Sequence, residues 1–104
     1  MQHKNSDKVE VLKTEFAQGF KLANTSLHEI VHLSLEQKGI VPAHALNVNV
    51  VFYVIKGEGN LTVENDTYIA KTGDVLEVTA NLQRSWINKS LTTLELLVIK
   101  QNPA

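Results

Sequence analysis

The sequence predicts an all-β domain of short antiparallel strands. Short runs that alternate apolar and polar residues recur along the chain, and Gly, Asn and Asp residues separate them at intervals of about ten residues. This spacing is typical of antiparallel sandwiches and barrels. A length of 104 residues corresponds to one domain with one core. We therefore expect a single domain over residues 1–104, with residues 1–8 as a frayed N-terminal segment.

The first part of the chain contains one clear strand and one ambiguous segment. Residues 9–12 alternate and predict a strand at the edge of a sheet. In residues 14–22, Phe16 and Phe20 lie four apart, which favours a helical turn, but Gly19 between them weakens a helix. An irregular loop fixed by the two phenylalanines is the alternative.

Residues 27–35 have the period of two that is typical of a strand, and Val31, Leu33 and Leu35 form the face expected to enter the core. Residues 37–39 then predict a turn. Pro42 predicts an edge or loop position, because proline cannot donate a backbone hydrogen bond to a neighbouring strand.

Residues 48–56 form the strongest predicted strand, and they are apolar on both faces. A strand of this kind is expected where both sides of a sheet are covered, so we expect one face to meet a second copy of the chain in a homodimer. Residues 65–66 predict a two-residue hairpin loop. Further strands are expected over residues 61–64, 68–70, 75–78, 84–87 and 93–99.

The composition argues against several partners and sites. The 10 Lys and Arg residues balance 11 Asp and Glu residues without a basic run, so no nucleic-acid or membrane partner is expected. No cysteine is present, which removes disulfides and thiolate ligands and is typical of a reducing compartment. The start of the chain lacks an apolar leader. We expect a cytoplasmic protein.

The segment from His28 to His32 matches the H-E-x-x-H zinc signature. That chemistry needs the two histidines one turn apart on a helix, whereas this segment has the period of a strand. In a strand, His28 and His32 would lie about 13 Å apart, too far to share one ion. We interpret the match as a coincidence that leaves both imidazoles at the surface or an interface.

Two groups of residues in the second half of the chain have a characteristic spacing: Gly39, Pro42, His44 and Gly57, then Gly73, Asp74 and Asn88. This spacing resembles the two sequence motifs of the cupin superfamily. The resemblance implies a small RmlC-like domain with a double-stranded β-helix, or jelly-roll, barrel. Independently, glycine allows the positive φ of tight turns, and Asp74 can accept a local backbone hydrogen bond.

The resemblance also implies where a metal would be bound: by two histidines of a His-x-His pair, a glutamate and a third histidine. His44 is the only motif ligand retained, because Leu46, Val50 and Arg84 occupy the other three positions. Apolar side chains have no lone pairs and a guanidinium is a permanent cation. We therefore expect no metal and no other cofactor.

His44 and Arg84 each have two readings. His44 is either a packed histidine with a polar neighbour or a group that contacts a ligand or carries a proton. Arg84, if buried, needs an anion. In one reading the anion is internal, from Glu77 or Glu95, or the guanidinium simply extends to solvent. In the other reading the anion is a small carboxylate or phosphate ligand that Arg84 holds bidentately.

The sequence therefore predicts a cupin-like protein that binds a small organic molecule, anionic if Arg84 contacts it, without a tightly held metal. The candidate ligand-binding residues are His44, Leu46, Val50, Phe52, Arg84 and Trp86. No catalytic residue is assigned. Two alternatives stay open: a metal-assisted isomerase, lyase or oxygenase that combines His44 with another histidine or Glu58, and a dimeric scaffold whose barrel is filled and has no cavity of a few hundred Å³.

Overall fold

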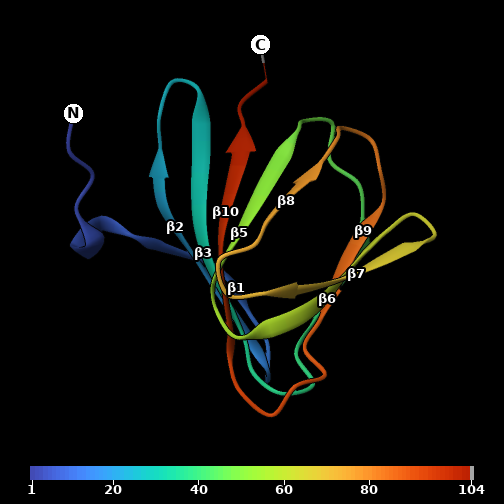
Figure 1. Cartoon of the computed structure of the whole chain (residues 1–104). Coiled ribbons are helices and arrows are strands. Elements are labelled where there is room, and N and C mark those ends of the chain that lie inside the picture. The colour runs from blue at the N-terminus through green and yellow to red at the C-terminus, as the bar shows by residue number, and fades with distance from the viewer. Residues whose placement is uncertain (104) are drawn as a thin grey trace.

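A computed structural model describes residues 1–103 and confirms the all-β prediction (Figure 1). A short 3-10 helix, η1, precedes ten strands in this part of the chain. The elements are η1 Asn5–Asp7, β1 Val9–Lys13, β2 Ala17–Asn24, β3 His28–Leu35, β4 Ile40–His44, β5 Val50–Lys56, β6 Glu58–Val63, β7 Asp66–Lys71, β8 Val75–Val78, β9 Arg84–Ile87 and β10 Leu94–Gln101. Within the described residues, no helix is long and apolar enough to cross a membrane.

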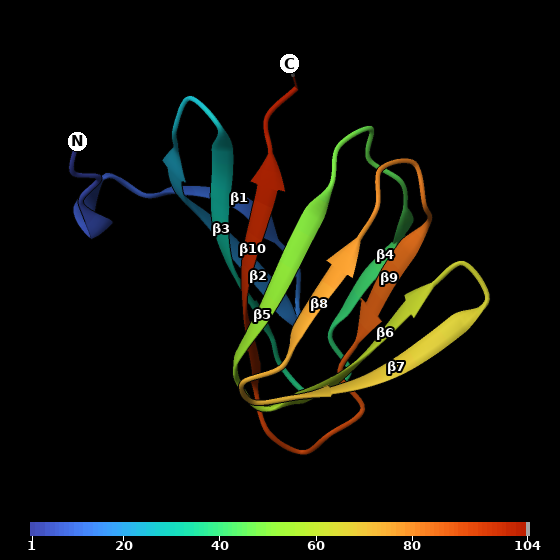
Figure 2. The same ribbon diagram turned by 45° about the horizontal axis from the view of Figure 1, so that its top comes forward.

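The strands form two antiparallel sheets that face each other. One sheet has the order β1-β2-β3-β10-β5-β8 and the other the order β4-β9-β6-β7. Figure 2 shows that the sheets converge at the end where β9 leads into β10 and diverge at the end where β10 finishes. β4 ends, β9 begins and β10 ends at the diverging end.

Side-chain alternation places the core between the two sheets. The predicted inward face of β3 is confirmed, since Val31, Leu33 and Leu35 are all buried. β10 pairs in register with β3 on one side and with β5 on the other, and the matching faces of β10 and β5 are also buried: Val50, Phe52, Val54, Leu94, Leu96 and Val98. Phe52 contacts Trp86 of the opposite sheet edge to face, with ring centroids 5.4 Å apart and planes at 75°. This aromatic pair ties the sheets together across the core.

The expectation for residues 14–22 is wrong, because this region contributes strand β2. β2 pairs with β1 on one side and with β3 on the other, so its backbone hydrogen bonds are satisfied by tertiary pairing. Gly19, which argued against a helix, faces inward, and a Cβ there would lie 3.3 Å from Leu12 Cβ. Phe20 is not a core anchor but packs under Lys8, whose Nζ lies 4.7 Å from the ring centroid. Long-range pairing therefore overrode the local pattern.

Other predicted features agree with the structure with small corrections. β1 lies at an edge of its sheet and Pro42 lies in β4, an edge strand of the other. The hairpin between β6 and β7 is present, but its loop is Glu64 and Asn65, because Asp66 already pairs with Val63. Glu64 has a φ of 53°, and its N–H donates to Gln83 O at 2.9 Å, which fixes the turn one residue earlier than predicted.

The expectation that both faces of residues 48–56 are covered does not hold within the described chain. Val50, Phe52 and Val54 are buried, but on the outer face of β5 Tyr53 and Ile55 are 40% and 41% exposed. Homodimer formation through this face stays a prediction.

The turn residues of the two motifs have identifiable structural roles. Gly73 adopts a φ of 90°, and Asp74 accepts a hydrogen bond at Oδ2 from Lys71 N at 2.8 Å, as predicted. Asn88 is fully buried, and its Nδ2 donates to Leu35 O and Thr92 O, each at 2.8 Å. Asn88 thereby fastens the β9–β10 connection to the end of β3.

Candidate functional site

A cavity of about 310 Å³ lies between the two sheets. This volume is at the lower end of the range for small-molecule sites, about 300–1,000 Å³. The lining is apolar side chains and Gly19, except for His44, Arg84 and Lys100. A filled barrel would have lacked such a cavity, so the structure argues against the filled-scaffold alternative.

Five of the six predicted ligand-binding residues line this cavity: His44, Leu46, Phe52, Arg84 and Trp86. Val50 is buried and points inward, but it does not line the cavity. It lies opposite Lys100 of β10, and Lys100 is the residue that reaches the cavity from this level of the sheet.

Strand register brings the polar residues together. His44 of β4 lies directly opposite Arg84 of β9, and Val41 lies opposite Trp86. An irregularity between Val41 and His44, at Pro42, lets both residues face the cavity although they are three apart in sequence. Proline is tolerated there because β4 is an edge strand.

Arg84 is a buried cation, and no carboxylate of residues 1–103 forms an ion pair with it. Its side chain is 2% exposed, its Nε donates to Leu82 O at a long 3.5 Å, and its Nη2 is buried and has no hydrogen-bond partner within the described residues. Burial lowers the pKa of Arg84, but a guanidinium stays protonated at neutral pH. Its Nη2 is a donor that an anion in the cavity could satisfy.

Neither of the two glutamates predicted as internal partners forms an ion pair with Arg84 within residues 1–103. Glu95 is engaged elsewhere: its carboxylate lies 3.2 Å from His32 Nε2. Glu77 makes no ion pair within residues 1–103. Extension to solvent is ruled out by the burial of the side chain. The expectation that both glutamates come from strands neighbouring Arg84 is wrong, because β8 and β10 belong to the six-stranded sheet and β9 belongs to the four-stranded sheet. Glu77 and Glu95 also alternate with the buried residues Val78, Leu94 and Leu96, which gives them outward parity.

Trp86, which also lines the cavity, has a second unsatisfied donor. The residue is 1% exposed, and its Nε1 is buried without a partner among the residues described. Unsatisfied buried donors cost about 1–3 kcal/mol each and are rare in folded proteins. Both donors belong to residues of one strand, β9, and both residues line the cavity.

His44 is an exposed imidazole of the cavity lining. Its Nδ1 lies 2.9 Å from Pro42 O, so when Nδ1 carries the proton it donates to that carbonyl and leaves Nε2 as an acceptor. Among the described residues, no carboxylate lines the cavity beside it. The titratable groups of the lining are one imidazole, that of His44, and two cations, Arg84 and Lys100.

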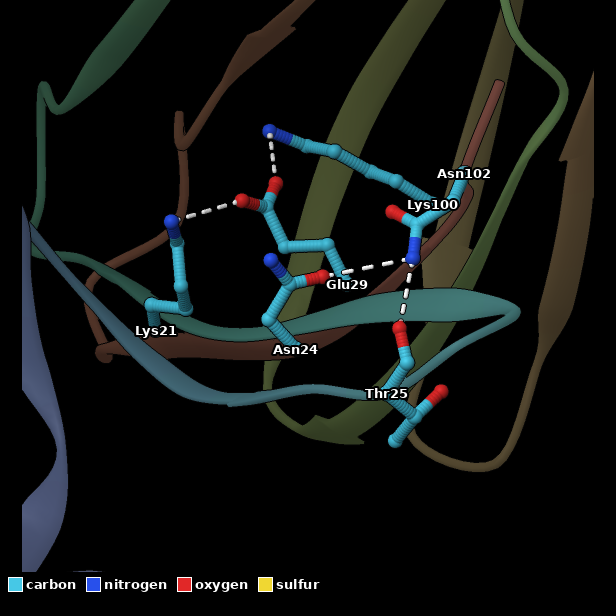
Figure 3. Close-up of polar contacts among 6 residues, drawn as sticks. All are labelled: Lys21, Asn24, Thr25, Glu29, Lys100 and Asn102. Carbon is cyan, nitrogen blue, oxygen red and sulfur yellow. Dashed lines mark hydrogen bonds and ion pairs between the residues drawn. The ribbon is translucent and has the colours of Figure 1, made fainter. Parts of the chain in front are cut away.

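Lys100 of the cavity lining belongs to an ion-pair group that the sequence reasoning missed (Figure 3). The carboxylate of Glu29 lies between two ammonium groups, with Oε1 3.0 Å from Lys21 Nζ and Oε2 3.4 Å from Lys100 Nζ. The Lys21 hydrogen bond, supported by Lys100, holds the pKa of Glu29 below its ordinary range despite partial burial.

The strand period of two could have predicted that Glu29 and Lys100 face inward. Glu29 lies two residues before Val31, and Lys100 lies two residues after Val98, so both have the inward parity of a core position. Figure 3 also shows Asn102, whose Nδ2 donates to Thr25 O at 2.7 Å and fastens the end of β10 to the β2–β3 turn.

The donor set does not fit the metal that the cupin motifs imply. His44 is accompanied in the cavity by Leu46 and Arg84, which cannot ligate a divalent cation. Within residues 1–103 no three His, Cys, Asp or Glu side chains are grouped to hold an ion. Glu58, considered as an additional ligand, instead lies 3.9 Å from Lys71 Nζ.

Comparison with known proteins identifies relatives of the chain. Residues 31–100 match the model of the Cupin domain family. An uncharacterised protein of Methanocaldococcus jannaschii is 33% identical over 81 residues, which cover 77% of this chain and 70% of the relative.

Solved structures share the architecture. The crystal structure of an RmlC-like cupin from M. jannaschii with a double-stranded β-helix fold superposes with a TM-score of 0.77 at 31% identity, covering 91% of this chain and 90% of the other. A predicted oxalate decarboxylase of Thermotoga maritima (TM-score 0.84, 17% identity, 99% and 100% covered) and an RmlC-like cupin of Shewanella frigidimarina (0.83, 15%, 96% and 88%) are similar in fold. The last two are similar in fold alone.

Proposed function

The chain belongs to the Cupin domain family, and we propose that it binds a small organic anion in its barrel, with Arg84 as the anchor of the acidic group. The single observation that carries this proposal is the buried Nη2 of Arg84, which has no partner among the described residues and belongs to a residue of the cavity lining. A carboxylate or phosphate oxygen would satisfy this donor.

The rest of the lining defines the ligand class. The unpartnered Nε1 of Trp86 favours a second acceptor oxygen on the same group, as in a carboxylate. The apolar majority of the lining favours a hydrocarbon body, aromatic or aliphatic. A volume of about 310 Å³ corresponds to roughly ten water volumes, so the ligand is small. The proposed ligand is a compact amphipathic acid.

Isothermal titration calorimetry with benzoate and hexanoate tests the proposal, with benzamide and hexanamide as neutral analogues. The acids should bind and the amides should bind at least about tenfold more weakly, because a charge-assisted hydrogen bond contributes about 1.5–3 kcal/mol. Arg84→Met should lose the preference for acids. Lys56→Met, which removes one exposed positive charge away from the cavity, is the matched control and should bind as the wild type does.

Three outcomes would overturn the proposal. One is the absence of binding by every acid tested. The second is equal binding of acids and amides, which would mean that only the apolar lining selects the ligand. The third is unchanged acid binding by Arg84→Met, or an equal loss in Lys56→Met, since either would separate the affinity from the buried guanidinium.

A further inference from the structure

The polar side chains of the cavity lining differ in what they can offer a ligand. Arg84, Trp86 and Lys100 carry N–H groups and have no side-chain acceptor. The other lining residues, apart from His44, are apolar or glycine. His44 is therefore the one lining residue, among residues 1–103, whose side chain can accept a hydrogen bond.

The contact between His44 and Pro42 fixes which ring nitrogen is the acceptor. Nδ1 of His44 lies 2.9 Å from Pro42 O, and Nδ1 is the ring nitrogen that is hydrogen-bonded within the described residues. A carbonyl oxygen only accepts, so Nδ1 carries the proton in this hydrogen bond. In the neutral ring the other nitrogen, Nε2, then has a lone pair and no hydrogen. The contact with Pro42 thereby leaves a free acceptor on a ring that lines the cavity.

The acceptor belongs to the strand neighbour of the anion anchor. His44 of β4 lies directly opposite Arg84 of β9, and both residues line the cavity. Residues in this relation on one face of an antiparallel pair have Cβ atoms about 4.5–5.5 Å apart. A ligand whose acidic group is held by Arg84 therefore has its adjacent atoms beside His44. At that position a hydrogen-bond donor on the ligand would be complementary to Nε2.

We infer that the ligand carries a hydroxyl group next to its acidic group, as in a 2-hydroxy acid, and that this hydroxyl donates to His44 Nε2. This inference rests on the proposed function, because it presupposes that Arg84 binds the acidic group. An ammonium group could also donate to Nε2, but the charged side chains of the lining, Arg84 and Lys100, are both cations. Repulsion between like charges favours a neutral donor, so the ligand class is a hydroxy acid rather than an amino acid.

The test uses four acids with the same compact apolar body: cyclopentanecarboxylate and its 1-hydroxy, 1-methoxy and 1-amino derivatives. Isothermal titration calorimetry is done at pH 8, where an ordinary histidine is neutral. The readout is the dissociation constant of each derivative relative to that of the parent acid. The hydroxy acid should bind about threefold to tenfold more tightly than the parent acid. The methoxy acid keeps the oxygen but lacks the O–H, so it should bind no more tightly than the parent, and neither should the amino acid.

Two histidine variants test whether His44 is the acceptor. His44→Phe should remove the preference for the hydroxy acid and should leave the binding of the parent acid through Arg84. His32→Phe is the matched control, because His32 Nε2 lies 3.2 Å from the Glu95 carboxylate and His32 does not line the cavity. This control should keep the wild-type preference. A role of His44 in folding alone would weaken the binding of all four acids equally and would leave the preference intact.

The outcomes separate this inference from the proposed function. If the parent acid binds through Arg84 but the hydroxy acid binds no more tightly, or if the preference persists in His44→Phe, the hydroxyl contact is wrong and the proposed function stands. Equal gains for the hydroxy and methoxy acids would show that the added oxygen accepts rather than donates, which overturns the inference. An amino acid that binds as tightly as the hydroxy acid, or an equal loss of preference in His32→Phe, would also overturn it. If none of the acids binds, both proposals fall.

Discussion

Replacing Arg84 with methionine should stabilise the unliganded protein, even though it removes the proposed anion anchor. Arg84 is 2% exposed as a residue, and its Nη2 is buried without a partner among the described residues. Its Nε–H donates to Leu82 O at 3.5 Å, a distance too long for a strong hydrogen bond. Methionine has a comparable length and adds no polar hydrogen, so it can fill the same space.

The expected magnitude follows from the unsatisfied donor. A buried donor without a partner costs about 1–3 kcal/mol, and the substitution removes that cost with little loss of hydrogen bonding. The free energy of unfolding should therefore rise by about 1–3 kcal/mol. The melting temperature should rise by roughly 4–8 °C for each kcal/mol in a domain of this size. Stability exchanged for function in this way is common at binding sites.

Urea denaturation at neutral pH measures the effect, with the free energy of unfolding obtained by linear extrapolation. The midpoint should move to higher urea with the slope unchanged. Lys56→Met, at an exposed position, should change the free energy of unfolding by less than about 0.5 kcal/mol. An Arg84→Met variant that is less stable than the wild type by more than about 1 kcal/mol would refute the reasoning, because it would mean that the guanidinium is already satisfied.

Three further predictions concern other parts of the molecule. The pKa of Glu29 is lower in the folded state, so its ion pairs stabilise the fold above the ordinary glutamate pKa of 4.5, and this stabilisation is lost as pH falls below it. On acidification, the free energy of unfolding of the wild type should fall by up to about 1 kcal/mol relative to that of Glu29→Gln, as measured by urea denaturation at a series of pH values. Parallel curves of unfolding free energy against pH for the two proteins would contradict this. Gly57→Ala should destabilise the protein by at least about 1 kcal/mol more than Gly73→Ala. Both glycines have a positive φ, but a Cβ at Gly57 would lie 2.5 Å from the backbone oxygen of Thr93, whereas a Cβ at Gly73 would meet no atom within 4 Å. Equal losses of melting temperature in the two variants would show that only φ determines the cost. Tyr53→Lys, on the outer face of β5, should convert a homodimer to a monomer in sedimentation velocity, and a wild type that is monomeric at every concentration would disprove the predicted interface.

Much of the fold could be predicted because strand structure is encoded locally. A period of two indicates which side chains face inward, and this rule correctly placed Val31, Leu33 and Leu35 in the core. The same rule put Arg84 and Trp86 on one buried face. Turn residues also predicted strand boundaries. Gly73, for example, lies in a turn with a φ of 90°, a conformation that favours glycine.

The errors arose where local sequence had no decisive preference. Residues 17–24 became strand β2 because β1 and β3 pair with it on both sides, a contribution that no window of the sequence contains. The outer face of β5 is as apolar in sequence as a covered face, yet Tyr53 and Ile55 are partly exposed. Apolar character predicts that burial is favourable and does not identify the partner.

The sequence by itself determined that the chain forms a β-barrel, that His44 is the only retained motif ligand, and that a cation stands at Arg84 in place of the last one. Only the tertiary structure decided whether that cation is buried and whether a carboxylate of the described residues pairs with it. Whether Arg84 has an internal anion depends on the direction of carboxylates from strands distant in sequence, and Glu95 lies beside His32 while Glu29 lies between Lys21 and Lys100. Ion pairing depends on distances of a few ångströms between strands, and only the assembled sheets fix those distances.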